Sequence, residues 1–351
     1  MAAFALLATT AFSFPAGAEP PADAGEAKLA EVLEGLRQAE QRPRMGTLRW
    51  ASEYVLNDDA GFRGTTRKIT VTGSESDLAD AWRVDVRRES WEPTNTGPID
   101  AGPTEVGPEA VEPDLEVHFR RNVSCYDGIK TLQAVYPEKD SQYPTVELHA
   151  GNVPSRDRLN PYMLLFNRGQ VRASLSQWLG GELAPGDESF VGHNHLWTPR
   201  YLRTEQIDGI QVHVVSVEYR NALKPKGPAL WNWTLHLAPE RDYLPVKVEY
   251  WNPYKTPGFP TESIVLSDLV QADDGRWFPR RAVQGTTNAY ATRSSDELKI
   301  ASTTTYTMDW RPDELIDRSE LCKDTAPKGG WPGSSVQQDE EPETQPEGER
   351  D

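Results

Sequence analysis

The sequence contains very little cysteine. Only two of its 351 residues are cysteines, Cys125 and Cys322, and they do not form a CxxC pair. A cysteine-based metal site or redox motif is therefore not expected. The two thiols are either independent buried side chains or one disulfide, which would tie a mid-chain strand to the end of the domain in an oxidising compartment.

Short motifs that carry common chemistries are also missing. The sequence has no G-x-S-x-G nucleophile elbow, no G-x-G-x-x-G fingerprint and no Walker A loop. His193-Asn194-His195 is the tightest cluster of metal-ligand residue types, but a closed zinc site needs four ligands and the flanking residues are typical of a polar loop. We therefore expect no metal and no cofactor, and these motifs identify no catalytic residue.

Carboxylates are abundant, so a pair of catalytic carboxylates cannot be dismissed by counting. The two obvious doublets are Asp58-Asp59 and Asp273-Asp274. Both lie close to a glycine in a predicted turn, where acidic residues need no catalytic reason. A carbohydrate-active hydrolase remains an alternative on this evidence.

Positive charge is scarce, with 37 Lys and Arg against 54 Asp and Glu and a net charge of -17. This balance argues against nucleic acid and against anionic membrane surfaces as partners. Residues 1–18 carry no charge at all, and their apolar core precedes the small residues Ala16-Gly17-Ala18. We interpret residues 1–18 as a signal peptide, although the usual positive n-region is missing, and expect a periplasmic or extracellular protein.

Apolar runs long enough to span a membrane are absent from the rest of the sequence, so no transmembrane segment is expected. Residues 326–351 are dominated by Pro, Gly and acidic residues and predict a disordered acidic tail. With residues 19–25 as a linker, residues 26–325 form one predicted domain. The Pro- and Gly-rich residues 93–113 are a predicted loop insertion in it.

What the sequence does contain is strand patterning. Trp231, Trp233 and Leu235 alternate with polar residues, and Val246, Val248 and Tyr250 do the same after a turn. Similar runs precede and follow Asp-Gly pairs at residues 127, 208 and 274. Asp-Gly between alternating runs is a strong hairpin signal, so these segments predict an antiparallel sheet.

Helical patterns are few. Residues 26–41 place Leu29, Val32, Leu33 and Leu36 on one face and predict an amphipathic helix. A second helical patch is predicted from Asn160-Pro161, which suit a helix start, to about Leu179. These helices are too few to cover both faces of a large sheet. The prediction is a mainly β (α+β) fold with a curved, half-open barrel.

The two strand pairs also carry a family resemblance. Residues 231–251, with the turn Pro-Glu-Arg-Asp and the return Leu-Pro-Val, resemble a strand pair of lipoprotein carriers. Residues 264–280 resemble the hairpin of the same family that reads Asp-Gly-x-Trp-Phe-Pro. The helix followed by residues 48–54 and the Asn160-Pro161 segment are consistent with it. The family is the bacterial lipoprotein-localisation superfamily of periplasmic carriers.

This resemblance implies a half-open antiparallel barrel with the N-terminal and mid-chain helices as a lid over an apolar cavity. It implies a non-enzymatic protein that binds a lipid, a lipoprotein acyl chain or another apolar small molecule, without a cofactor. Lipoprotein or lipid handling at the outer membrane and an envelope protein as partner belong to the same expectation. An envelope sensor or structural protein is a further alternative. The candidate ligand-lining residues are Trp50, Tyr54, Trp82, Trp231, Trp233 and Leu235, although core packing of the sheet is the simpler explanation for tryptophans on one face.

Overall fold

The computed structural model describes residues 22–42, 45–57, 67–93, 115–139, 144–152, 155, 157–166, 174–181, 195–224, 226–295, 297–322 and 325. The predicted signal peptide, almost all of the predicted insertion and the predicted acidic tail lie outside these residues. Within them, no helix is both long and apolar enough to cross a membrane.

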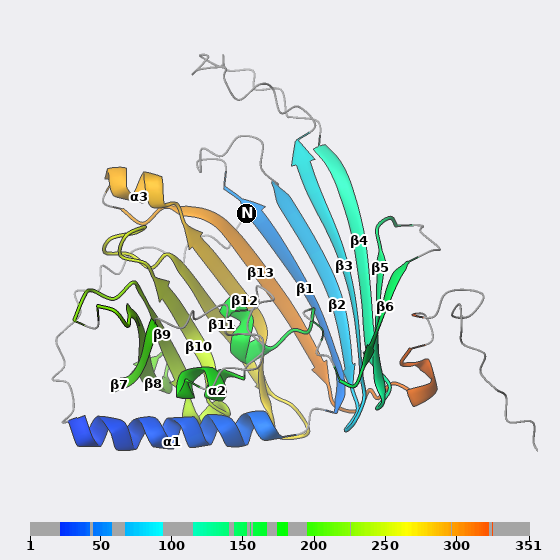
Figure 1. Cartoon of the computed structure of the whole chain (residues 1–351), viewed down its shortest axis with the longest axis horizontal. Helices are drawn as coiled ribbons and strands as arrows, with labels where there is room; N and C mark the ends of the chain where they lie inside the picture. Colours follow the sequence, from blue (N-terminus) through cyan, green and yellow to red (C-terminus); the bar gives the residue numbers. More distant parts are fainter. Residues whose placement is uncertain are drawn as a thin grey trace, which may run out of the picture.

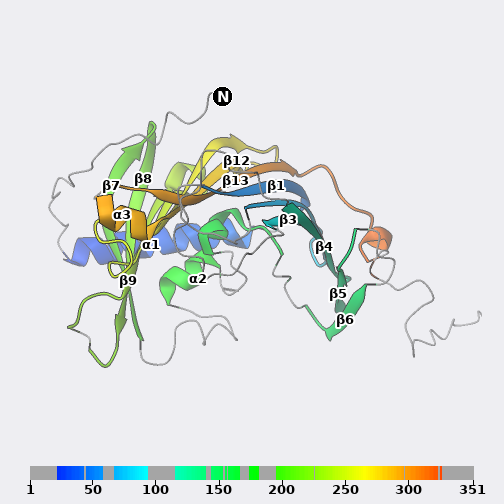
Figure 2. The same ribbon diagram turned by 90° about the horizontal axis from the view of Figure 1, so that it is seen from above.

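All described strands belong to one antiparallel sheet of 13 strands. The strand order is β6-β5-β4-β3-β2-β1-β13-β12-β11-β10-β9-β8-β7. The chain therefore forms two consecutive meanders, and the last strand returns to pair with the first (Figure 1). The sheet curves into an open arch whose concave side faces α1 and α2 (Figure 2). The predicted mainly β class and half-open curved sheet are confirmed.

The first meander contains six strands: β1 (Gly46–Leu56), β2 (Lys68–Asp77), β3 (Trp82–Pro93), β4 (Leu115–Tyr126), β5 (Lys130–Tyr136) and β6 (Thr145–Ala150). The second contains seven: β7 (His195–Ile207), β8 (Ile210–Asn221), β9 (Trp231–Ala238), β10 (Leu244–Trp251), β11 (Glu262–Gln271), β12 (Trp277–Thr287) and β13 (Ile300–Arg311). The edge strand β6 was not individually predicted, although Val146, Leu148 and Ala150 alternate with polar residues in this six-residue segment.

The predicted hairpin turns are present. Between β7 and β8, Asp208 and Gly209 have φ of 48° and 78°, the positive values that a two-residue hairpin turn requires. Asp127-Gly128 separates β4 from β5, and Gly275 with φ of 81° lies between β11 and β12. Local turn chemistry therefore explains how each strand folds back onto its neighbour.

Helix α1 spans Ala22–Gln41 and begins before Glu26, so the predicted linker of residues 19–25 is wrong for its second half. Ala22 and Ala24 are strong helix formers that directly follow Pro21, and the helix continues through Gly25 in spite of the low helix propensity of glycine. The short helix α3 (Ala289–Ser295), which was not predicted, connects β12 to β13. A further single turn, η4 (Arg318–Glu320), follows β13.

The mid-chain helical patch is two short elements in the connection between the meanders. Asn160 caps η2 (Pro161–Phe166), because its Oδ1 accepts a hydrogen bond of 3.1 Å from the Tyr162 backbone N–H. Ser174 and Gln177 form a capping box at α2 (Leu175–Gly180). Leu175 and Trp178 of α2 are almost completely buried, so this short helix is held by packing on the sheet.

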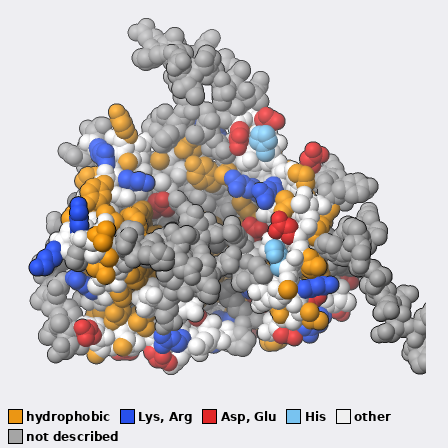
Figure 3. All heavy atoms as spheres, viewed as in Figure 1, with side chains coloured by type: hydrophobic (Ala, Val, Ile, Leu, Met, Phe, Trp, Pro, Cys, Tyr) orange, Lys and Arg blue, Asp and Glu red, His pale blue; other side chains and the backbone are white. Residues whose placement is uncertain are grey.

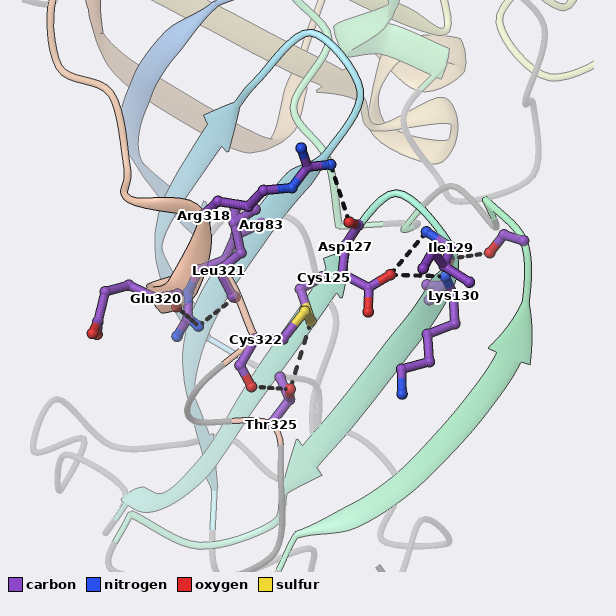
Figure 4. Close-up of a disulfide and its surroundings, with 12 residues drawn as sticks. Arg83, Cys125, Asp127, Ile129, Lys130, Arg318, Glu320, Leu321, Cys322 and Thr325 are labelled. Atoms are coloured by element: carbon purple, nitrogen blue, oxygen red, sulfur yellow. Dashed lines mark hydrogen bonds between the residues drawn. A yellow bond between two sulfur atoms is a disulfide. The ribbon is translucent and has the colours of Figure 1, made fainter. Parts of the chain in front are cut away.

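Cys125 of β4 and Cys322, which follows β13, form a disulfide with their Cα atoms 5.7 Å apart. Figure 4 shows the segment after β13 lying against β3 and β4 around this bond. The Arg83 side chain donates a hydrogen bond of 2.8 Å to the Leu321 carbonyl, and Leu321 is fully buried. The end of the described chain is thereby fastened to the first meander.

Candidate functional site

The strand register assigns the six candidate residues to one face. Side chains of directly opposed residues in an antiparallel sheet point to the same side. Trp50 lies opposite Met308 and Gly73, and the pairing continues from strand to strand to Trp82 on one side and Trp233 on the other. This is the face that packs against the helices, the concave face of the arch.

The helices cover the part of this face that the second meander forms. Trp178 of α2 lies edge-on to Trp233, with ring centroids 5.9 Å apart, and edge-on to Trp197 at 4.4 Å. Trp233 is 8% exposed and Leu235 is completely buried. Trp231 stacks on Tyr219 at 4.0 Å and is half-buried. Trp233 and Leu235 therefore belong to the packed core of the structure as it stands.

The connection between the meanders crosses the concave face of β2 and β3. The Arg158 guanidinium contacts the Glu75 carboxylate at 2.6 Å and the Asp77 carboxylate at 2.5 Å. Both carboxylates are buried, and Arg158 also lies over the Trp82 ring at 5.3 Å. Burial lowers the pKa of Arg158, but the two carboxylates outweigh it and the pKa is raised. Arg158 thus stays charged and fastens this segment to the sheet.

Between these covers lies a half-exposed apolar surface. We call it the trough, and it consists of Trp50, Tyr54, Ile69, Val71 and Tyr306, which share the concave face of β13, β1 and β2. Trp50 contacts both the core under α1 and the smaller cluster around Trp82. The trough therefore joins the two packed regions of the concave face.

Gly73 explains how the Trp50 indole lies in the trough. A Cβ atom on Gly73 would lie only 2.2 Å from Cε2 of Trp50, closer than any real contact. The indole therefore rests directly on the β2 backbone, opposite its own strand position. Its N–H is buried and has no hydrogen-bond partner among the described residues.

Two arginines border the trough. Arg88 of β3 lies opposite Val71 on one side and opposite Arg120 of β4 on the other, so all three share the concave face. Arg88 and Arg120 are both exposed. The space-filling view shows basic side chains gathered beside apolar ones on the right-hand half of this face (Figure 3). An apolar floor with a positive border suits an amphipathic ligand more than a purely apolar one.

A second concavity lies on the opposite face of β3 and β4. It has a volume of about 560 Å³ and is lined by charged and apolar side chains, among them the half-buried Glu89, Trp91 and Phe119. The Lys68 ammonium lies over the Trp91 ring at 5.6 Å. This groove is open to solvent and holds no cluster of buried polar groups, so we do not interpret it as the functional site.

The acidic pairs show structural roles. Glu75 and Asp77 are engaged by Arg158, and Glu75 also accepts the Leu159 backbone N–H at 3.2 Å. Asp274 accepts the Arg276 backbone N–H in its hairpin turn, and Asp58-Asp59 lies outside the described residues. The described residues contain no group of three or more His, Cys, Asp or Glu arranged to hold a metal. His195 begins β7, while His193 and Asn194 are not described.

Neither a protein-family model nor a curated protein matches this sequence. Among solved structures, the chain is similar to a domain from Vibrio parahaemolyticus assigned to outer membrane lipoprotein sorting. The identity is 11%, the TM-score is 0.36, and 86% of this chain and 97% of that chain are covered. It is also similar to a DUF1329 family protein from Desulfovibrio piger, with 10% identity, a TM-score of 0.38, and 84% and 96% covered.

The first of these structures is of the class that the hairpin sequences resemble. At such TM-scores neither similarity carries an argument about the site, which is therefore interpreted from its own residues. Of the six candidates, Trp50 and Tyr54 lie in the trough. Trp231 is half-buried on the part of the concave face that the second meander forms. The other three, Trp82, Trp233 and Leu235, are buried. Whether any of them lines a ligand stays a prediction.

Sequence reasoning missed Val71, Arg88 and Arg120 as site residues. A signal was present, because Arg87-Arg88 and Arg120-Arg121 are two doublets on either side of the predicted insertion. Pairing these two segments as neighbouring strands would have brought the doublets together. The length of the insertion concealed that they are opposite each other.

Proposed function

We propose that this protein is a non-enzymatic binding protein that holds an apolar chain, such as a lipid acyl chain, in the trough. The observation that carries the proposal is the half-exposed apolar surface on the concave face, between the α2 cover and β3. Covering it with ligand would contribute about 0.8 kcal/mol for each CH2 group removed from water. Helices α1 and α2 and the connection held by Arg158 would form the walls.

The proposal includes a location outside the cytoplasm. The Cys125–Cys322 disulfide supports it, because such bonds persist in oxidising compartments. Lipoprotein acyl chains, or a lipid delivered by an envelope partner, are ligands that would fit this setting. No observation on the described residues favours the alternative carbohydrate hydrolase, since the buried carboxylates of Glu75 and Asp77 are both held by Arg158.

Uptake of the neutral fluorophore N-phenyl-1-naphthylamine and its displacement by 1-dodecanol would test this proposal. We expect saturable uptake by delipidated wild-type protein. Val71→Asp should weaken it at least about tenfold, because a carboxylate in the trough would lose hydration when the apolar ligand covers it.

Thr72→Asp is the matched control. Thr72 is the next residue of β2, is exposed, and points to the opposite face. This variant should bind as the wild type does, and melting temperatures would show that both variants fold. A wild-type protein that takes up no apolar probe, or equal loss in both variants, would refute the proposed function.

A further inference from the structure

We propose that the ligand of the trough is an anionic amphiphile, whose carboxylate or phosphate head group is bound by Arg88 and Arg120. The inference deepens the proposed function and rests on it. It identifies the chemical class of the ligand by its charged end as well as by its apolar chain.

The two arginines form a like-charged pair on the concave face. Residues directly opposite in an antiparallel pair have Cβ atoms roughly 4.5–5.5 Å apart, and like charges there destabilise the sheet. Arg88 makes no ion pair or hydrogen bond with another described residue. Arg120 donates a hydrogen bond of 3.0 Å to Asn122 Oδ1 but has no described carboxylate partner. The described residues therefore leave the pair without a counter-charge.

The other face of the same two strands shows the contrast. Arg87 lies opposite Arg121, so a second arginine pair occupies the convex face. There the Arg121 guanidinium makes two hydrogen bonds to the Asp85 carboxylate, of 3.0 Å and 2.5 Å. The Asp85 carboxylate thus offsets positive charge in the convex arginine pair. The concave pair has no such carboxylate partner among the described residues, so its guanidinium groups are available to an external anion.

Neighbouring side chains confine the anion to one position along β3 and β4. Toward one end, the next pair on the concave face is Ser90 with His118, and the pair after it is Glu92 with Glu116. The His118 imidazole lies 3.9 Å from both glutamates, so that end of the ladder repels anions. Toward the other end, Asn122 donates to Asp157 at 3.0 Å. Only the arginine pair between these positions attracts a negative head group.

The apolar end of the ligand would begin beside this position. Val71 is the direct neighbour of Arg88 across β2 and β3, and Trp50 and Tyr306 follow toward β13. Two guanidinium groups can bind carboxylate or phosphate through several charge-assisted hydrogen bonds. A head group held there places its chain over the trough. The whole protein carries a net charge of -17 and on average repels anions, so binding of a negative head group requires a local positive site such as this arginine pair.

The experiment compares two ligands with the same chain and different heads, dodecanoate and 1-dodecanol, at pH 8 in low salt. Each displaces N-phenyl-1-naphthylamine from wild-type protein, Arg88→Gln, Arg120→Gln and Arg87→Gln. Arg87→Gln removes the same charge from the convex face of the same strand. We expect dodecanoate to bind the wild type more tightly than 1-dodecanol does. This preference should fall at least about tenfold in Arg88→Gln and Arg120→Gln, but not in Arg87→Gln.

Melting temperature is the second readout. Because Arg88→Gln removes repulsion within the pair, it should melt no lower than the wild type, whereas loss of a structural contact would lower the melting temperature. Equal affinity of the two ligands for the wild type would overturn the inference and leave the proposed function intact. An equal loss of the preference for dodecanoate in Arg87→Gln and Arg88→Gln would also overturn the inference. Displacement of dodecanoate by inorganic phosphate alone would assign the pair to a free anion, whereas uptake of neither ligand would refute the proposed function itself.

Discussion

At the scale of single residues, one missing side chain determines the shape of the candidate site. Gly73 leaves room for the Trp50 indole to lie flat on β2, with contacts that a Cβ atom would make impossible. The consequence is that Trp50 covers backbone instead of standing upright in the arch. The indole then contributes to the floor of the trough, where Trp50 and Val71 both pack against the cluster around Trp82.

A second residue with a distinct environment is His213, which is 3% exposed beneath α1. Its ring lies 5.8 Å from the Tyr201 ring, and its Nδ1 lies 3.2 Å from the Thr204 hydroxyl. Burial lowers the pKa of His213, and the Lys28 ammonium lowers it further, while Glu31 opposes them weakly. The folded protein therefore resists protonation of this ring.

This lowered pKa predicts a loss of stability at acidic pH. An unfolded histidine takes up a proton near pH 6.5, whereas folded His213 stays neutral to lower pH, so the free energy of unfolding should fall as pH drops below about 6.5. Above that pH, His213 contributes no slope. Buried His236 adds a loss of the same sign, because burial and Lys247 lower its pKa against the opposing effects of Glu249 and Glu205.

Denaturant unfolding at pH 7.5 and 5.5 would measure this dependence. His213→Gln should reduce the difference in unfolding free energy between pH 7.5 and pH 5.5 by up to about 1.4 kcal/mol, because one proton is taken up over the single pH unit below 6.5. An unchanged difference in this variant would contradict the assignment to His213.

At the scale of elements, the connection between the meanders decides which part of the arch is covered. Leu159 and Tyr162 near η2 and Trp178 of α2 are buried against the second meander. Arg158 fastens the same connection to β2 of the first meander. One segment therefore covers both sides of the trough, and its position sets how much apolar surface remains open.

This packing predicts the effect of removing the Trp233 side chain from β9. Trp233→Ala should lower the free energy of unfolding by about 3–5 kcal/mol, because the indole is buried against Trp178 and Tyr250. Trp231→Ala, at the half-exposed neighbour on the same face, should cost less. Urea unfolding would compare the two variants. Strongly reduced ligand uptake by Trp233→Ala with only modest destabilisation would instead show that Trp233 lines the ligand site.

At the scale of the whole molecule, two contacts between distant parts of the chain hold the meanders together. Strand β13 pairs with β1 along almost the full length of both strands. The disulfide then links β4 to the residues after β13, with a sequence separation of 197. Both contacts fasten the second meander to the first, so the arch behaves as one sheet.

Removal of the disulfide should therefore destabilise the entire protein. We expect the double variant Cys125→Ser with Cys322→Ser to lose about 2–4 kcal/mol of unfolding free energy, since the bond restricts a long loop in the unfolded chain. Thermal unfolding with and without reductant would test it. The wild type should melt lower in reductant and the variant should not respond. A wild type whose melting is unaffected by complete reduction, confirmed by thiol titration, would contradict the prediction.

Much of this organisation is local and was predicted from the sequence. Alternating apolar residues and the turns at Asp127, Asp208 and Asp274 are sufficient for the hairpins, because strand period and positive φ are properties of neighbouring residues. The same applies to α1 and to the Asn160 cap. Edge strand β6 and helix α3 were not individually predicted. Strand β6 does alternate but is only six residues long, and the seven residues of α3 show no clear apolar period.

The candidate site was decided by tertiary structure. Sequence alternation placed Trp231 and Trp233 on one face but did not show that α2 covers Trp233. From the sequence, Cys125 and Cys322 could be two separate thiols or one disulfide. The disulfide forms because the chain beyond β13 returns to β4. Arg88 and Arg120 lie on either side of the connection formed by residues 94–114, and only the pairing of β3 with β4 brings their charges together beside Val71. The physical reason is that covering, pairing and charge opposition depend on contacts between distant segments, which local periodicity does not encode.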